Sequence, residues 1–229
     1  MKKLGLIGGI SWVSTADYYR LINQGANDKL GGLNFAECII YSFNYADIKK
    51  NNDNNDWDKT FARVLEAAEY LKDAGAEGLI LCANTMHLIA DRLQEVIGLP
   101  IIHIATATAN DIKRSALKKV GLLGTRFTME LDFFRSKLAD QDIDTIIPGI
   151  DDRLFIQETI YNELGKGIIV KQTKERYIAI VNELISSGAE GIILGCTEIP
   201  LVVQPVDVKI KIFDTTQIHA RAAVEFALG

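Results

Sequence analysis

The sequence AGAEGLILCA at residues 74–83 returns at residues 187–196 as SGAEGIILGC. The two copies align without a gap at an offset of 113 residues, and six of their ten positions are identical. Each half of the chain also begins with a glycine-rich apolar run, LGLIG at 4–8 and VGLLG at 120–124. An internal repeat of this kind indicates two copies of one structural unit. We therefore expect two similar α/β domains related by a pseudo-twofold axis.

The alignment of the two copies also shows which residue corresponds to Cys82 and to Cys196. Cys196 in the second copy corresponds to Ala83 in the first, and Cys82 corresponds to Gly195. Neighbouring residues of a strand point to opposite faces. If Ala83 faces a site, Cys82 is therefore expected to point away from it into the core. Cys38 lies within an apolar run and is expected to be a core residue too.

Composition excludes several classes of protein. The chain has 229 residues, of which 48% are hydrophobic and 24% charged, which suits two small globular domains. A net charge of −5 without a Lys/Arg-rich run argues against nucleic acid or an acidic membrane surface as partner. No 18-residue apolar stretch and no signal-peptide pattern is present, so we expect a cytoplasmic protein. The three cysteines form no CxxC or Cys/His cluster, so neither a disulfide framework nor a metal site is predicted.

Strands and helices are expected to alternate along the chain. The expected strands are 3–7, 36–43, 78–82, 101–104, 119–123, 143–147, 191–195 and 210–213. The expected helices are 14–22, 57–72, one beginning at 84–85, 128–138, 151–164, 173–187 and 216–228. The Asn- and Asp-rich segment 44–56 is expected to be a long loop. Such alternation predicts parallel sheets covered by helices, in a first domain of residues 1–98 plus 211–229 and a second of residues 99–210.

The turns after the strands are the expected place of a site. In parallel α/β sheets, ligands sit beyond the carboxyl ends of the strands. Four turns follow such ends and are expected to line one cleft between the two domains: 8–11, 83–85, 124–125 and 196–198. The glycines of the first turn do not form a GxGxxG pattern, so a dinucleotide site is not predicted.

Cys196 is the strongest candidate for chemistry. It lies in GCTEIP at 195–200, where a strand is expected to end and a helix to begin. The positive end of a helix favours a thiolate, so its pKa is expected below the usual value of about 8.5. Thr197 offers a hydroxyl, and Glu198 is a candidate to hydrogen-bond to the thiol or to tune it. The alternative interpretation is a buried, inert cysteine.

Five segments together resemble the aspartate/glutamate racemase superfamily, the racemases that do not use pyridoxal phosphate. They are GLIGGISW at 5–12, CANTMH at 82–87, LLGTRFTM at 122–129, GCTEIP at 195–200 and FDTTQIHA at 213–220. They occur in the family's order over the whole chain, and the aspartate racemase branch is the most similar. The resemblance implies a cofactor-independent isomerase of a small acidic amino acid, aspartate and then glutamate, and commonly a homodimer.

The resemblance also implies a mechanism. In this family one thiolate removes the α-proton and an opposite thiol protonates the other face of the α-carbon. Cys196 matches the second family cysteine, whereas the first directly precedes Asn-Thr, where this chain has Ala83. Three explanations remain open. The protein is a natural enzyme of restricted stereochemistry, Ala83 is a substitution made to trap a substrate, or Cys82 reaches the site through a bulge.

The other candidate residues would bind carboxylates or modulate the site. A carbanion next to a carboxylate must be stabilised by preorganised donors. The residues that resemble this donor set are Ser11, Asn84, Thr85, Thr125 and Thr197. For the side-chain carboxylate, Lys166 in ELGKGI resembles the family's carboxylate-binding Lys. The family's Arg in the loop after the second strand has no counterpart here, which makes Asn52 a candidate neutral donor, while His87 is a candidate modulator.

Two other functions remain possible for such a site. A one-cysteine decarboxylase or isomerase of a dicarboxylate would form product without interconverting D and L enantiomers. A non-catalytic binder of acidic amino acids would be stabilised by its ligand without exchanging the α-proton.

Overall fold

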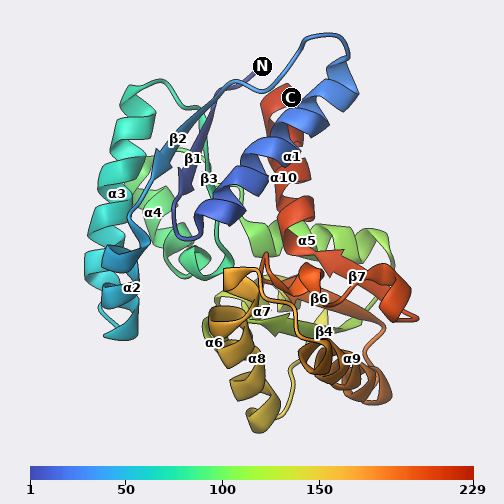
Figure 1. Cartoon of the computed structure of the whole chain (residues 1–229). Coiled ribbons are helices and arrows are strands. Elements are labelled where there is room, and N and C mark those ends of the chain that lie inside the picture. The colour runs from blue at the N-terminus through green and yellow to red at the C-terminus, as the bar shows by residue number, and fades with distance from the viewer. The chain divides into compact units, whose positions relative to one another are not determined.

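The computed structural model describes all 229 residues, and the chain divides into two units. Unit 1 comprises Met1–His103 and His219–Gly229, and unit 2 comprises Ile104–Ile218. Each unit has one fully parallel sheet flanked by helices, which confirms the expected α/β class with two parallel-sheet domains (Figure 1). None of the helices is both long and apolar enough to span a bilayer.

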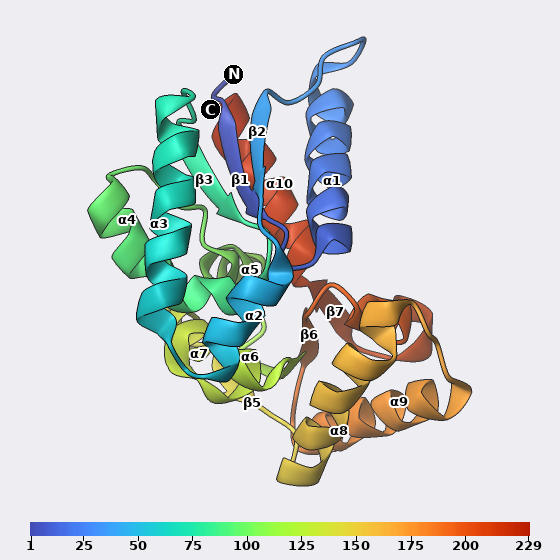
Figure 2. The same cartoon turned by 60° about the vertical axis from the view of Figure 1, so that its left-hand side comes forward.

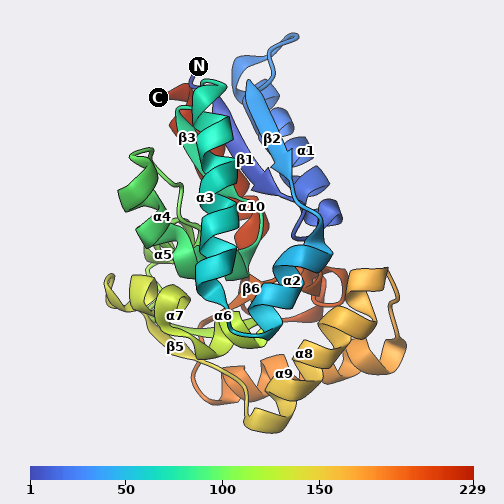
Figure 3. The same ribbon diagram turned by 90° about the vertical axis from the view of Figure 1, so that its left-hand side faces the viewer.

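Unit 1 has the strand order β2-β1-β3. Its strands are β1 (Leu4–Gly8), β2 (Cys38–Ser42) and β3 (Gly78–Leu81). Its helices are α1 (Trp12–Leu30), α2 (Tyr45–Asp53), α3 (Trp57–Asp73), the 3₁₀ helix η1 (Asn84–Ile89), α4 (Ala90–Ile97) and most of α10 (Thr215–Leu228). One apolar cluster joins the sheet to α3 and α4, and another joins it to α1 and α10 (Figure 2). Both chain termini lie in this unit (Figure 3), and Lys2 N donates to Ala227 O at 2.8 Å.

Unit 2 has the strand order β5-β4-β6-β7. Its strands are β4 (Lys119–Gly124), β5 (Asp144–Ile146), β6 (Gly191–Gly195) and β7 (Lys211–Asp214). Its helices are α5 (Ile104–Arg114), α6 (Arg126–Glu130), α7 (Asp132–Ala139), α8 (Ile150–Asn162), α9 (Lys171–Ser186) and the 3₁₀ helices η2 (Leu164–Lys166), η3 (Ile199–Leu201) and η4 (Pro205–Asp207). The single helix expected near 128–138 is thus two short ones. Helices α8 and α9 both pack on β4.

The repeated segments adopt the same local structure in the two units. Gly75 and Gly188 follow the ends of α3 and α9 with φ of +91° and +95°, a conformation that favours glycine. Gly78 and Gly191 begin β3 and β6, and a Cβ on either would lie within 3 Å of a phenylalanine ring. Two of the six identical positions are therefore explained by backbone conformation or by close packing.

The shared glutamates have the same role in both copies. Glu77 Oε2 accepts a hydrogen bond from Lys3 N at 2.8 Å, and Glu190 Oε2 accepts one from Lys119 N at 3.1 Å. Each carboxylate therefore binds the backbone at the start of the neighbouring strand. The strand pairing corresponds as well, because β1 pairs with β3 in unit 1 and β4 pairs with β6 in unit 2.

The Asn-rich segment 44–56 is not the expected loop. Residues 45–53 form α2, which contacts α3 and buries Ile48 completely. Asn52 of α2 accepts a hydrogen bond from Thr60 of α3 at 2.8 Å. Asn and Asp are weak helix formers, but tertiary packing overrides that propensity here, so the loop prediction was wrong.

The strand expected at 101–104 is not formed either. Only Ile101 pairs, in an isolated bridge to β3, and Ile104 already begins α5. This helix was not predicted, although the buried residues Ile104, Thr108 and Ile112 follow a four-residue helical spacing. The short apolar run around Ile101 indicated a strand, so the helical spacing that begins at Ile104 was not recognised.

The domain limits also need correction. The expected first domain included residues 211–229, but β7 pairs with β6 in the sheet of unit 2, through Ile212 with Ile192 and Phe213 with Ile193. The chain therefore crosses between units after His103 and again after Ile218. A short apolar strand next to the last helix does not reveal which sheet it joins.

Candidate active site

The predicted site residues come from both units, and most of them lie in or next to turns that follow strands, whereas Asn52 lies in α2 and Lys166 in η2. Unit 1 carries Ser11, Asn52, Ala83, Asn84, Thr85 and His87, and unit 2 carries Thr125, Lys166, Cys196, Thr197 and Glu198. In unit 1 the turns after β1 and β3 lie at the same edge of the sheet, because these parallel strands are neighbours. In unit 2 the same holds for the turns after β4 and β6.

The turn after β1 is fixed by its glycines and by Thr15. Gly9 has φ of +81°, and a Cβ there would lie 2.3 Å from the backbone of Phe43. Gly9 N donates to Thr15 Oγ1 at 2.9 Å, and this hydroxyl donates to Ser11 O at 2.9 Å. Ser11 caps α1 by accepting from Ser14 N at 3.3 Å. The Ser11 hydroxyl thus accepts within its own turn and keeps its proton for another acceptor.

Cys82 and Ala83 point to opposite faces of the sheet, as predicted. Cys82 is 1% exposed and belongs to the cluster on the α1 and α10 face, where burial raises the pKa of its thiol. Ala83 is half-buried and packs against the cluster of α3 and α4. Strand β3 pairs with β1 without a bulge as far as Leu81. The core assignment of Cys82 is confirmed, and the hypothesis that a bulge brings its thiol into the site was wrong.

The segment after Ala83 begins a helix, as predicted, although the first turn is 3₁₀. Asn84 is buried, whereas Thr85 is half-buried. His87 is buried, and its Nδ1 lies 3.1 Å from Ala83 O and 3.3 Å from Asn84 O. Burial and His103 hold the pKa of His87 well below its usual value, so the ring is neutral. His87 therefore contacts the backbone of the turn.

Ser14 is a positioning residue that the sequence did not reveal. Its Oγ donates to Cys82 O at 2.8 Å, and it is buried. This bond ties the first turn of α1 to the end of β3, next to Ala83. The signal available in the sequence was the Ser14-Thr15 pair three residues after the Ser11 cap, which is common at helix starts and therefore not specific.

Asn52 has only part of its amide available for a ligand. Its Oδ1 accepts from Thr60, which leaves the NH₂ group as the donor that the resemblance requires. Lys49, on the same helix, pairs with Asp53 at 2.5 Å. Asn52 therefore remains the candidate neutral donor to a ligand carboxylate.

In unit 2, one carboxylate oxygen binds both polar side chains of the GCTE turn. Cys196 Sγ donates to Glu198 Oε2 at 2.8 Å, and Thr197 Oγ1 donates to the same oxygen at 2.7 Å. Burial, and then the Glu198 charge, raise the pKa of Cys196 well above its usual value. The expected lowering was wrong, because the helix that follows is a single 3₁₀ turn with little dipole, whereas a carboxylate is in direct contact. Cys196 rests as a thiol.

The strand ends that carry these turns approach closely. Gly124 pairs with Gly195, and a Cβ on Gly195 would lie 2.9 Å from Leu123 O. Thr125 follows Gly124, is buried, and caps α6 by accepting from Thr128 N at 3.4 Å. Thr125 and Cys196 therefore begin neighbouring turns at one edge of the sheet.

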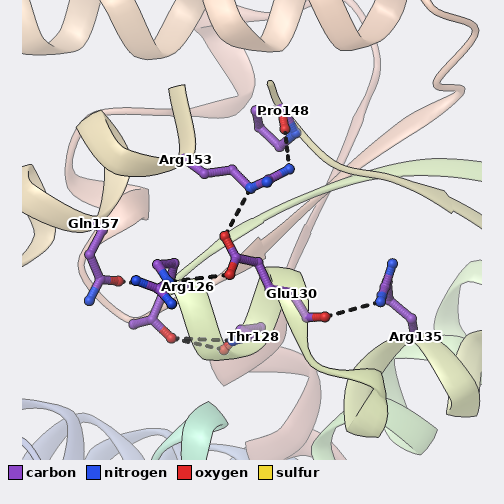
Figure 4. Close-up of polar contacts among 8 residues, drawn as sticks. Arg126, Thr128, Glu130, Arg135, Pro148, Arg153 and Gln157 are labelled. Carbon is purple, nitrogen blue, oxygen red and sulfur yellow. Dashed lines mark hydrogen bonds and ion pairs between the residues drawn. The ribbon is translucent and has the colours of Figure 1, made fainter. Parts of the chain in front are cut away.

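A charged network supports the Thr125 turn (Figure 4). Arg126 N donates to Gln157 Oε1 of α8 at 2.8 Å, and its Nε donates to Glu130 Oε2 at 3.2 Å. The other Glu130 oxygen accepts from Arg153 Nε at 3.1 Å. These bonds join α6 to α8 and thereby support the turn between β4 and α6.

Lys166 and Tyr177 are two further titratable residues of unit 2. Lys166 ends η2, is exposed and makes no ion pair, so its ammonium is available to a carboxylate. Tyr177, which was not predicted, is fully buried on α9 with its hydroxyl 3.0 Å from Thr159 Oγ1. Burial mainly raises its pKa, and the negative charges of Glu163 and Glu198 add to the shift. No group of His, Cys, Asp and Glu is arranged to hold a metal ion.

Comparisons with known proteins agree on one family. The family model described as Asp/Glu/Hydantoin racemase matches residues 7–223. A broad specificity amino-acid racemase of Bacillus subtilis is 24% identical over 99% of this chain and 98% of its own length. A candidate Asp/Glu racemase of Yersinia pestis is 46% identical with a TM-score of 0.96, and both chains are covered completely. An aspartate racemase homologue of Pyrococcus horikoshii is 34% identical with a TM-score of 0.88, again with complete coverage of both chains.

Proposed function

Since the chain belongs to the Asp/Glu/hydantoin racemase family and is an isomerase of amino acids, we propose that it racemises acidic amino acids, aspartate before glutamate, by proton transfer at Cys196. The thiol carries the proton itself, so the proposed reaction needs no cofactor. A cytoplasmic location and a homodimer remain predictions.

The observation that carries this proposal is the set of bonds around Cys196. Its thiol is half-buried at the end of β6 and donates to Glu198, which also accepts from Thr197. A carboxylate in contact with a thiol can accept its proton once a cationic substrate ammonium lowers the cost of the thiolate. Glu198 is therefore proposed to set the protonation state of Cys196.

The proposed step moves one proton and one electron pair. The Cys196 thiolate takes the α-proton, an S–H bond forms, and the pair of the broken C–H bond is delocalised into the substrate carboxylate. Donors from Ser11, Asn84, Thr85, Thr125 and Thr197 are proposed to stabilise that carboxylate. The side-chain carboxylate is proposed to bind Lys166, whose ammonium makes no ion pair, and the NH₂ group of Asn52.

The opposite face of the α-carbon is proposed to face Ala83, which carries no proton. Return of the proton from Cys196 gives back the starting enantiomer, whereas inversion requires a proton from solvent on the other face. We therefore expect inversion to be slower than exchange, and exchange to occur mainly from the enantiomer whose α-hydrogen faces Cys196.

The test is chiral chromatography of L- and D-aspartate and L- and D-glutamate after incubation without pyridoxal phosphate. Cys196→Ser should lower racemisation at least about 100-fold, because a hydroxyl is a far weaker acid than a thiol. Cys38→Ser is the matched control, since Cys38 is the other half-buried thiol, and should keep full activity.

Three results would overturn the proposal. Racemisation that survives Cys196→Ser would remove the thiol from the mechanism. Loss of carbon dioxide without D/L interconversion would identify the one-cysteine decarboxylase. Ligand-induced stabilisation with neither reaction would identify a binder of acidic amino acids.

A further inference from the structure

All three histidines of the chain meet inside unit 1. The ring of His87 lies edge-to-face with two others, with centroids 4.9 Å from His103 and 5.2 Å from His219. His87 and His219 are buried, and the ring of His219 in turn packs edge-to-face on Tyr18 at 5.4 Å. These residues come from η1, from the segment before α5, from α10 and from α1, so the cluster joins four parts of the sequence.

Two members of this cluster mark the points where the chain passes between units. His103 is the last residue before the first crossing, and His219 is the first after the second. His219 Nε2 lies 2.5 Å from Ile102 O, so this nitrogen is the donor, and Nδ1 accepts from the Tyr18 hydroxyl at 2.8 Å. The two chain segments at these crossings are thus hydrogen-bonded to each other through His219 and Ile102, and to α1 through Tyr18.

His87 joins the cluster to the turn after β3. Both contacts of its Nδ1 are to carbonyl oxygens, those of Ala83 and Asn84, so Nδ1 carries the proton. The C=O and N–H of a trans peptide point in opposite directions. Holding these two carbonyls toward the imidazole therefore turns the N–H groups of Asn84 and Thr85 away from it.

The second nitrogen of His87 makes histidine a costly residue at this position. Nε2 is buried without a hydrogen-bond partner, and such a group costs stability that an apolar side chain of similar size would not. The neutral ring has one N–H group, on Nδ1, and donates it to the carbonyl oxygens of the turn.

We propose that His87 is a positioning residue for the racemase reaction, which orients the Asn84 and Thr85 amides toward the substrate carboxylate through the Ala83 and Asn84 carbonyls. This inference rests on the proposed function, because it assigns those amides to the substrate. It also places the residues at the two chain crossings, His103 and His219, against the ring that orients the turn.

The test compares two substitutions of His87. In His87→Asn, the side-chain NH₂ lies near the position of Nδ1 and can keep a bond to the turn, whereas His87→Leu has no donor. His103→Leu is the matched control, because it removes a ring in edge-to-face contact with His87 and leaves the His87 donor in place. The measured quantities are kcat and KM for aspartate, the melting temperature, and hydrogen–deuterium exchange of the Asn84 and Thr85 amides.

For His87→Leu we expect the KM for aspartate to rise about tenfold with a smaller change in kcat, since the amides bind the carboxylate throughout the reaction. Exchange at the two amides should become faster, His87→Asn should recover most of both losses, and His103→Leu should show neither. An unchanged KM in His87→Leu, or equal losses in the Asn and Leu variants, would overturn the inference.

A failure of this inference can be distinguished from a failure of the proposed function. If the unsubstituted protein fails to racemise, the proposed function fails, and amide exchange still tests the orientation of the turn. If that exchange is the same in the unsubstituted protein, His87→Asn and His87→Leu, His87 does not position the turn. A fall in melting temperature with unchanged KM would indicate a structural role and would likewise overturn it.

Discussion

At the scale of the residue, the protonation of Cys196 depends on burial and on Glu198, which contacts it at 2.8 Å. Replacing Glu198 by Gln removes the negative charge that raises the thiol pKa. We therefore expect Glu198→Gln to lower the pKa of Cys196. The pH dependence of alkylation by iodoacetamide measures it in a Cys38→Ser background, because Cys82 is buried.

The control for this substitution is Glu175→Gln, an exposed glutamate of α9. It should leave the alkylation profile unchanged. A thiol pKa that stays the same or rises in Glu198→Gln would contradict the role given to the carboxylate.

Gly9 gives a second prediction at this scale. Gly9→Ala would combine a positive φ with a Cβ 2.3 Å from the backbone of Phe43, so it should destabilise unit 1 by more than about 2 kcal/mol. Gly98→Ala is the matched control, since φ is +67° there but nothing lies within 4 Å of the added atom, and it should cost only about 1 kcal/mol. Urea denaturation measures both, and equal losses would show that the close approach at Phe43 is unimportant.

At the scale of the element, the sequence predicted most where the repeat constrains it. Gly75, Gly188, Glu77 and Glu190 each have a specific backbone task, so the strands that follow them were placed correctly. Helix α2 was missed because its polar composition resembles a loop, whereas the burial of Ile48 and the bond from Thr60 of α3 to Asn52 stabilise it. Such long-range packing is not encoded in local propensity.

The same distinction applies to the candidate site. The opposite orientations of Cys82 and Ala83 follow from strand alternation and could be predicted. From the sequence, Glu198 was only a candidate to contact Cys196, because the contact depends on the conformation of a short turn. The pKa of Cys196 was therefore predicted in the wrong direction.

At the scale of the whole molecule, the histidine cluster predicts a loss of stability in acid. The pKa of His219 is lowered by burial to about 3, and that of His87 is also depressed. An unfolded histidine binds a proton near pH 6.5, so below that pH the unfolded state binds more protons than the folded state. Each buried histidine should thus remove up to about 1.4 kcal/mol of stability per pH unit as pH falls from about 6.5 toward the folded pKa.

Urea denaturation between pH 7 and pH 4.5 measures this slope. His87→Leu should make the dependence shallower by removing one of the two depressed groups. A stability that does not change below pH 6.5, or a slope unaffected by His87→Leu, would show that the cluster is not kept neutral in the folded state.

The central claim is that Cys196 transfers the α-proton opposite a position where Ala83 replaces a second thiol. The most direct measurement is the ratio of inversion to α-deuteration for L- and D-aspartate in D₂O, followed by NMR and chiral chromatography, in the unsubstituted protein and in Ala83→Cys. We predict more deuteration than inversion from one enantiomer, and a higher proportion of inversion in Ala83→Cys. An unchanged ratio in Ala83→Cys, together with loss of activity in Cys82→Ala, would contradict the assignment of both positions.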